Sequence, residues 1–216
     1  MNPSDAQQQR VEAAHYALLR RMAFAMRHDM VVDLQLIGMI TEVLEHRMAS
    51  PSPDLAQVHD SMGKVNKHVR AALQSSIEIV GWLAPEDGKL AALDVAVAEC
   101  VDMLRSQLNF RGFALRNETG AMPDQVPRAA VRGVLPAVLL ALTDHAASPA
   151  NVLITARSGE RSVRLDVVLQ RTEGDPGFTG APNYRLLEWD EVEALAQAAG
   201  VVIEGRGDAL AIVLPA

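Results

Sequence analysis

Aromatic rings and thiols are scarce in this chain of 216 residues: aromatic side chains make up 4% of it, and one cysteine is present. So few rings argue against a surface that stacks bases or sugars, and they favour helices packed through aliphatic side chains. A single cysteine excludes an intramolecular disulfide framework. Cys100 stands in an apolar run over residues 95–104, so we expect a buried and inert thiol.

A surplus of basic residues is also missing, since the formal net charge is -7. Non-specific binding to nucleic acid is therefore not expected, although Arg20, Arg21 and Arg27 could form a local basic patch. No stretch reaches the roughly 20 apolar residues that span a bilayer, and the first residues lack the basic start and apolar run of a secretory signal. We expect a cytoplasmic protein that binds neither nucleic acid nor a membrane.

Two long helices are predicted for the first part of the chain. Apolar residues over 11–43 recur at steps of three and four, so a helix should start near Ser4 and Asp5 and run to about Met48. Residues 49–54 hold two prolines, two serines and a capping aspartate, which break it. A second apolar stripe then predicts a helix that ends near Leu83. That stripe comprises Leu55, Val58, Met62, Val65, Val69, Leu73, Ile77 and Val80.

A short turn between two long helices makes them antiparallel, so residues 1–84 are predicted to form a helical hairpin domain. Two helices alone cannot cover both apolar stripes. A homodimer in which two hairpins form a four-helix bundle is the simplest solution.

The triplet Arg27-His28-Asp29 interrupts the first apolar stripe near its middle. Where the pattern calls for an apolar residue at position 29, the chain supplies Asp29, with His28 beside it. A charge placed there lowers stability unless it has a partner or a use. An imidazole next to a carboxylate, halfway along a bundle helix, indicates a site for proton or phosphoryl chemistry, since imidazole titrates near neutral pH.

Residues 88–216 predict a second, α+β domain. A helix is expected over residues 90–109, a short strand over 112–115 and another helix over 126–146. Strands over 151–156 and 163–168 are separated by a hairpin signal that contains Gly159. A loop over 171–183, a helix over 189–199 closed by Gly200, and a terminal hairpin over 201–214 complete the order.

This order of elements, with His28 and Asp29 near the middle of the first helix, resembles a bacterial sensor histidine kinase core. The resemblance covers residues 10–216. It implies a dimerisation and phosphotransfer hairpin that forms a dimeric four-helix bundle, followed by an α+β sandwich like the kinase ATP-binding domain, which has the Bergerat fold. His28 falls where the family carries its phosphorylated histidine, and Asp29 matches the acidic residue that follows it.

The chain departs from the family at the positions that serve phosphatase and nucleotide chemistry. Val32 and Asp33 stand where members carry Thr, Asn or Gln. His145 replaces the final asparagine of the NLLxNA-like pattern, which holds Mg²⁺ in the family. The Asp-x-Gly-x-Gly turn expected after Val168 and the glycine-rich lid are missing. Without these groups the backbone is not expected to hold a triphosphate.

A kinase-like hairpin joined to a degenerate ATPase-like domain resembles bacterial histidine phosphotransferases. That resemblance implies phosphoryl transfer between His28 and the aspartates of response-regulator receiver domains, which supply Mg²⁺, so the chain needs no cofactor or metal of its own. Asp29 would orient or activate His28, and Arg27 would support the charge of the phosphoryl group.

Two other functions stay open. One is a non-catalytic pseudokinase adaptor that binds and regulates a receiver or kinase, for which His28 would be dispensable. The other is a divergent active histidine kinase, which would bind ATP with Mg²⁺; we expect none. His15, His46, His59 and His68 are expected at the surface or in packing, and His145 beside Asp144 as a helix-end residue rather than a metal ligand.

Overall fold

The computed structural model describes residues 3–83, 88–178 and 184–215. Its compact units are Ala23–Pro85 and a larger unit made of Met1–Met22 with Glu86–Ala216. The expected fold class, a long helical region followed by an α+β sandwich, is confirmed.

The smaller unit is a helical hairpin. Helix α1 (Pro3–Met48) and helix α2 (Leu55–Leu83) lie close to their predicted bounds. Asp54 caps α2 as predicted: its Oδ1 accepts hydrogen bonds from the backbone N–H groups of Ala56 at 3.0 Å and Gln57 at 3.3 Å. Such a cap supplies acceptors for amides that have no partner inside the helix. The proline- and serine-rich break and this cap therefore fix where the hairpin turns.

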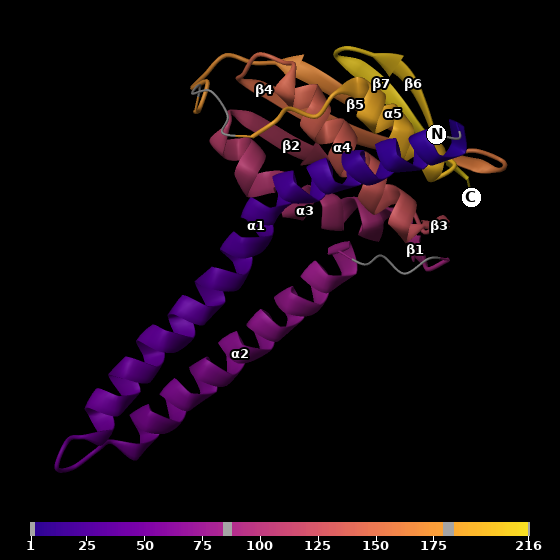
Figure 1. Cartoon of the computed structure of the whole chain (residues 1–216). Helices are drawn as coiled ribbons and strands as arrows, with labels where there is room; N and C mark the ends of the chain where they lie inside the picture. The colour runs from indigo at the N-terminus through magenta and orange to yellow at the C-terminus, as the bar shows by residue number, and fades with distance from the viewer. Residues whose placement is uncertain (1–2, 84–87, 179–183, 216) are drawn as a thin grey trace. The chain divides into compact units, whose positions relative to one another are not determined.

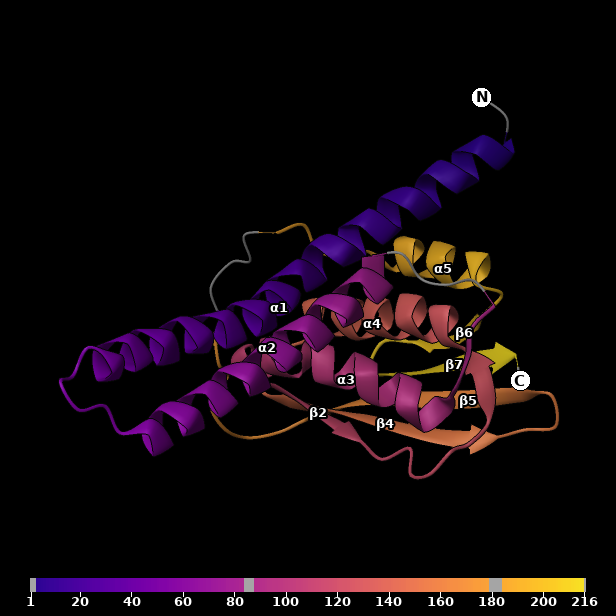
Figure 2. The same cartoon turned by 90° about the horizontal axis from the view of Figure 1, so that it is seen from below.

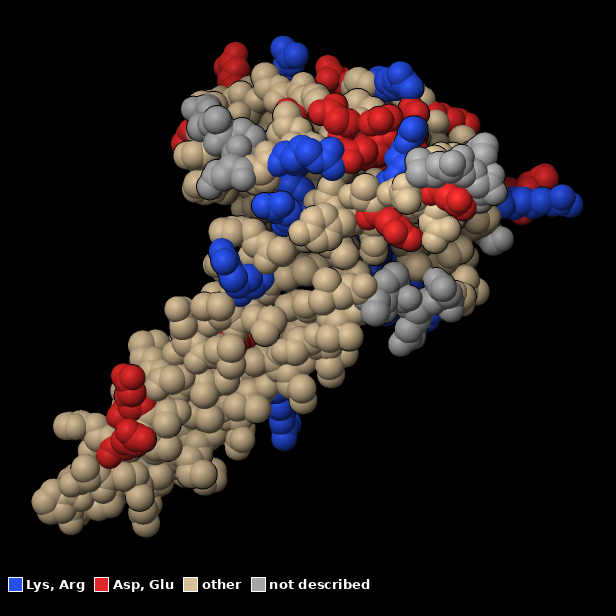
Figure 3. Space-filling view, viewed as in Figure 1, with Lys and Arg blue, Asp and Glu red and all other residues tan. Residues whose placement is uncertain are grey.

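The apolar stripes of the hairpin are largely solvent-exposed in the single chain. On α2 the exposed apolar residues repeat at helix spacing, and on α1 they continue the stripe beyond His28. Figure 3 shows few charged side chains on the face of the hairpin in view. The exposed members are Val31, Val32, Met39, Val43, Leu55, Met62, Val69, Leu73, Ile77, Val80 and Leu83.

The larger unit is built on a five-stranded sheet with the order β2-β4-β5-β7-β6. The helices α3 (Leu93–Phe110), α4 (Arg128–Asp144) and α5 (Trp189–Ala198) cover one face of this sheet (Figures 1 and 2). The β2–β4 pair is parallel and the other pairs are antiparallel. The strands are β2 (Phe113–Asn117), β4 (Ala150–Ser158), β5 (Ser162–Arg171), β6 (Val202–Arg206) and β7 (Ala209–Pro215).

Alternation along the central strands places the core between the sheet and the helices. On β5, for example, Val163, Leu165 and Val167 are fully buried, and the residues between them are half-buried. Helix α4 runs through the middle of the core, and 13 of its residues are buried. This is the pattern expected when one face of a sheet is covered and the other faces solvent.

Residues 90–92 differ from the sequence prediction. They were expected to begin a helix, but they form strand β1 (Leu90–Ala92), which pairs antiparallel with β3 (Gln125–Pro127). Helix α3 therefore starts at Leu93. The backbone N–H of Leu93 donates to the carbonyl of Asp124 at 3.0 Å, so a contact distant in sequence sets the start of this helix.

The loop after β5 packs tightly on the turn between α3 and β2. The backbone N–H of Phe178 donates to the carbonyl of Phe110 at 2.9 Å, and the two rings stack with centroids 5.4 Å apart. Gly112 has φ +80°, and a Cβ placed on it would lie 2.4 Å from the carbonyl oxygen of Pro176. Glycine is required at position 112 because the backbones approach too closely for a side chain.

The part of α1 up to Met22 belongs to the larger unit, whereas the division expected from the sequence, 1–84 and 88–216, assigned all of α1 to the hairpin. Ala14, Leu18 and Met22 are buried on one stripe of this segment. Gln7 donates to the side chain of Gln197 in α5 at 3.0 Å. One helix thus supplies apolar surface to two units.

Within the described residues, no helix has the length and apolar character needed to cross a membrane.

Candidate functional site

His28 lies in the hairpin unit, midway along helix α1, and its residue surface is exposed. Arg27 is also exposed, and its guanidinium lies 5.8 Å from the centre of the Phe24 ring. The helix is continuous through position 29, but the side chain of Asp29 falls outside the described part of the structure. Two of the three predicted site residues are thus accessible to a partner, and the contact predicted between Asp29 and His28 stays a prediction.

Asp33 contacts the second helix of the hairpin. Its Oδ1 lies 3.0 Å from Nδ1 of His68, and both side chains are 23% exposed. Position 33 is one of the positions at which the sequence departs from the histidine kinase pattern that it resembles. Here its carboxylate already has a partner in α2, so it links the two helices of the hairpin.

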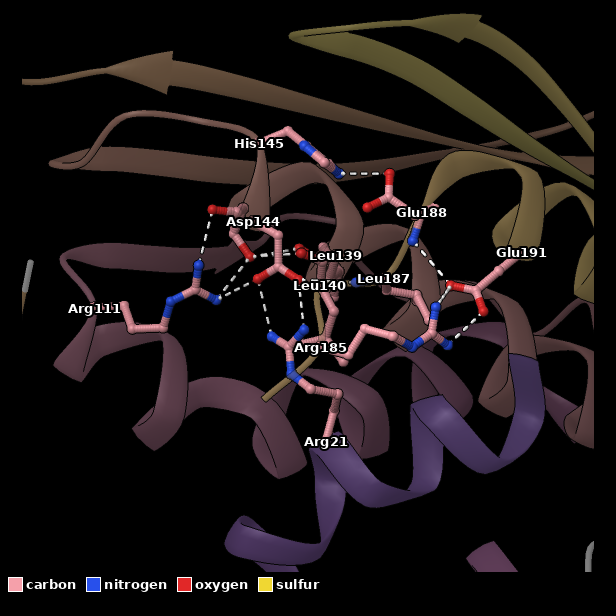
Figure 4. Close-up of polar contacts among 11 residues, drawn as sticks. Arg21, Arg111, Leu139, Leu140, Asp144, His145, Arg185, Leu187, Glu188 and Glu191 are labelled. Carbon is pink, nitrogen blue, oxygen red and sulfur yellow. Dashed lines mark hydrogen bonds and ion pairs between the residues drawn. The ribbon is translucent and has the colours of Figure 1, made fainter. Parts of the chain in front are cut away.

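A buried carboxylate organises the end of α4 in the larger unit. The Asp144 side chain is fully buried and receives two arginines (Figure 4). Arg21 donates from Nη1 at 2.5 Å and from Nη2 at 2.9 Å, and Nη1 of Arg111 lies 3.0 Å from Oδ1. A carboxylate at the C-terminal end of a helix meets the negative end of the helix dipole, so it needs such cationic partners.

The segment Tyr184–Glu188 contacts the same end of α4. The backbone N–H of Leu187 donates to Asp144 at 3.3 Å, and Nε2 of His145 lies 3.7 Å from the Glu188 carboxylate (Figure 4). The guanidinium of Arg21 lies 3.8 Å from the ring centre of Tyr184. The polar groups of Asp144 and His145 at the end of α4 therefore already have partners within this chain.

Arg21 does not belong to a surface basic patch, contrary to the sequence prediction. Its side chain is 2% exposed and pairs with Asp144, whereas Arg20 and Arg27 are exposed. The Nε atom of Arg21 has no hydrogen-bond partner among the described residues. The role of Arg21 was not predicted, although the sequence carries one signal for it: Asp144 ends an otherwise apolar helix at the terminus where an acidic residue is least stable.

The remaining histidines fit the expectation of surface or packing roles. His46 and His59 are exposed, His15 is half-buried and His68 pairs with Asp33. His145 is the residue that follows the last turn of α4. In the described part of the chain, no three His, Cys, Asp or Glu side chains gather closely enough to hold a metal ion.

Cys100 is buried in α3, as predicted. Its Sγ lies 3.8 Å from the carbonyl oxygen of Val131. Burial raises the pKa of the Cys100 thiol far above its usual range, because a thiolate would be poorly solvated there.

Solved structures share a distant likeness with the chain. The histidine kinase AdeS of Acinetobacter baumannii is 12% identical, with 82% of this chain and 93% of that one covered and a TM-score of 0.43. A histidine kinase from Burkholderia phymatum is 17% identical, with coverages of 94% and 96% and a TM-score of 0.45. A structure described as a bacterial phosphotransferase is 14% identical, with coverages of 99% and 97% and a TM-score of 0.38.

No protein-family model matches the chain, and no curated protein matches it. At these identities and TM-scores, no activity or residue role in this chain follows from the solved structures.

Proposed function

We propose that the chain is a histidine phosphotransfer protein of a two-component phosphorelay, with His28 as the phosphoacceptor. The observation that carries the proposal is an exposed histidine beside an exposed arginine, midway along the first helix of a hairpin. A phosphoacceptor must be reachable by a second protein, and the exposure of His28 on the helix surface meets that requirement.

The transfer step needs little from this chain beyond a nucleophile and positive charge. A neutral ring nitrogen of His28 attacks the phosphorus of an aspartyl phosphate on a receiver domain. A nitrogen–phosphorus bond forms, the acyl phosphate oxygen–phosphorus bond breaks, and the electron pair leaves with the aspartate carboxylate. Arg27 offsets phosphoryl charge. The role of Asp29, to orient the imidazole, rests on its place in the sequence. Mg²⁺ belongs to the receiver.

The contacts around Asp144 support a phosphoryl source other than ATP. In the related kinases the end of this helix and the lid hold the nucleotide. Here the end of α4 and the segment Tyr184–Glu188 bind each other through Asp144, Leu187 and the His145–Glu188 pair. Arg21 and Arg111 neutralise the buried Asp144 carboxylate at this end of the helix.

Homodimerisation through the hairpin is part of the proposal. Seven apolar residues of α2 from Leu55 to Leu83 are between 46% and 71% exposed. An exposed apolar surface of this extent along one helix indicates a protein interface. A second hairpin packed on it would complete a four-helix bundle.

The decisive experiment follows labelled phosphate. Purified protein is mixed with each phosphorylated receiver domain encoded in the same genome, and label on the chain is measured over time. His28→Ala should abolish labelling. His59→Ala is the matched control, because His59 is an exposed histidine that also precedes an aspartate in the hairpin. That variant should be labelled like the wild type.

The outcomes separate the proposed function from its alternatives. Label on the wild type and the His59 variant, but not on the His28 variant, supports phosphotransfer. Receiver binding without any transfer of label would refute it and leave a non-catalytic adaptor. Label that arrives from ATP and Mg²⁺ without a receiver would instead reveal a kinase.

A further inference from the structure

Phe24 is exposed on α1, with 59% of its surface accessible to solvent. Phe110 and Phe178 are also exposed, but their rings stack on each other. The Phe24 ring is covered in part by the guanidinium of Arg27, at 5.8 Å from the ring centre. Contacts between a cation and a ring hold out to about 6 Å, so this one lies near the outer limit and is readily exchanged for a stronger partner.

Phe24 lies next to His28 on the surface that a phosphotransfer partner would approach. Residues 24 and 28 are separated by four positions on a continuous helix, so their side chains are neighbours on one helix face. Transfer requires the aspartate of the partner to come within bonding distance of the His28 ring. A protein surface that makes this approach from the side of Phe24 covers its ring.

Arg27 has two competing partners once His28 carries phosphate. In the unphosphorylated chain its guanidinium lies by the Phe24 ring. A phosphoryl group on the adjacent residue brings almost two negative charges within reach of the same guanidinium. A charge-assisted hydrogen bond to phosphate is much stronger than an exposed contact with a phenylalanine ring.

We propose that Phe24 and Arg27 form a contact pair that responds to phosphorylation, a mechanism that rests on the proposed function of His28. Phosphorylation draws the Arg27 guanidinium to the phosphoryl group and uncovers the Phe24 ring. The uncovered ring then packs against an apolar patch beside the acceptor aspartate of the receiver. Phe24 thus favours binding of the receiver that is to be phosphorylated next, and release after the phosphate has left.

The first test measures transfer from phosphorylated chain to receiver. Phe24→Ala should raise KM about tenfold, the loss typical of an anchor residue at an interface, with kcat nearly unchanged. Phe24→Leu should recover most of the lost affinity, because it restores apolar contact. Tyr16→Ala is the matched control, since Tyr16 is a 67% exposed aromatic residue eight positions before Phe24 on α1. If KM is unchanged in Phe24→Ala while labelling still requires His28, the contact role of Phe24 is wrong and the proposed function of His28 stands.

The second test isolates the role of Arg27 with a receiver whose acceptor aspartate is replaced by alanine, so that it binds without taking phosphate. Phosphoramidate, a small phosphoryl donor, phosphorylates His28. The phosphorylated wild type should bind this receiver about two- to fivefold more tightly than the unphosphorylated form. Unphosphorylated Arg27→Gln should already bind with the higher affinity, because its Phe24 ring is uncovered.

The sign of the Arg27 effect decides between mechanisms. Weaker binding by unphosphorylated Arg27→Gln would mean that Arg27 itself contacts the receiver, and the uncovering mechanism would be wrong. Failure of both phosphoramidate and every receiver to label wild-type His28 would instead refute the proposed function, and the contact pair with it.

Discussion

Removal of the Asp144 carboxylate should destabilise the larger unit strongly. The Arg21 side chain is only 2% exposed, so in Asp144→Ala its guanidinium stays buried. It also loses both of its hydrogen bonds to the carboxylate. Arg111 is less affected, because it is 17% exposed and also donates to the Thr143 carbonyl at 3.0 Å. The variant therefore leaves one uncompensated buried charge.

The magnitude follows from the burial of that charge. Breaking a buried ion pair by removing one partner typically costs about 3–5 kcal/mol, which is a large part of the roughly 5–15 kcal/mol that stabilises a folded protein. With a urea dependence of about 2–3 kcal/mol per molar, the unfolding midpoint should fall by about 1–2 M.

Equilibrium urea unfolding followed by circular dichroism measures this change, and a second variant tests its cause. Arg21→Met combined with Asp144→Ala removes both charges, so it should be more stable than Asp144→Ala alone. Asp102→Ala is the control, since it breaks a surface pair with Arg105 and should leave the midpoint unchanged. A loss below about 1 kcal/mol in Asp144→Ala, or additive losses in the double variant, would refute the buried-charge account.

Three further predictions concern Cys100, Gly112 and Asp166. Cys100 should resist a thiol reagent in the folded protein and react fully in urea, because burial raises its pKa and blocks access; rapid labelling of folded protein would contradict this. Gly112→Ala should cost about 1–3 kcal/mol, because its Cβ would meet the Pro176 carbonyl, whereas Gly120→Ala, also at positive φ but in open space, should cost less in the same urea assay. Burial acts to raise the pKa of Asp166, but hydrogen bonds from Arg157 and Arg164 outweigh it and hold the pKa below 3.8. Its stabilisation should be present above that pH and vanish as pH falls through the lowered pKa, so the midpoint gap between wild type and Asp166→Asn should close in acid.

The order of elements was largely predictable, because it depends on local patterns. The break at residues 49–54 and the Asp54 cap set the hairpin turn, and alternation in β4 and β5 marked the sheet. Strand β1 was missed because its three residues are defined by pairing with β3, more than thirty positions away in the sequence. A run of three apolar residues before a helix carries no local signal for such pairing.

In the candidate site, too, features that depend on local sequence could be predicted, and those that depend on distant contacts could not. His28 and Arg27 were singled out by a local pattern, the polar break in an apolar stripe; both are exposed, and their roles stay predictions. Arg21 was placed on the surface because an arginine is usually exposed, and its partner is 123 positions away. The pattern of residues within one segment cannot predict that a charge there will form an ion pair with a carboxylate in a distant segment.

Because the larger unit includes the N-terminal part of α1, that unit cannot finish folding until the rest of its residues have been synthesised. The ribosome makes Arg21 123 residues before Asp144. At roughly 5–20 residues per second, this interval lasts about 6–25 s. For that time the face that carries Ala14, Leu18 and Met22 has no surface to pack on, so the nascent chain presents an apolar helix to chaperones. A fragment that begins at residue 88 would expose the complementary surface permanently, and we expect it to aggregate.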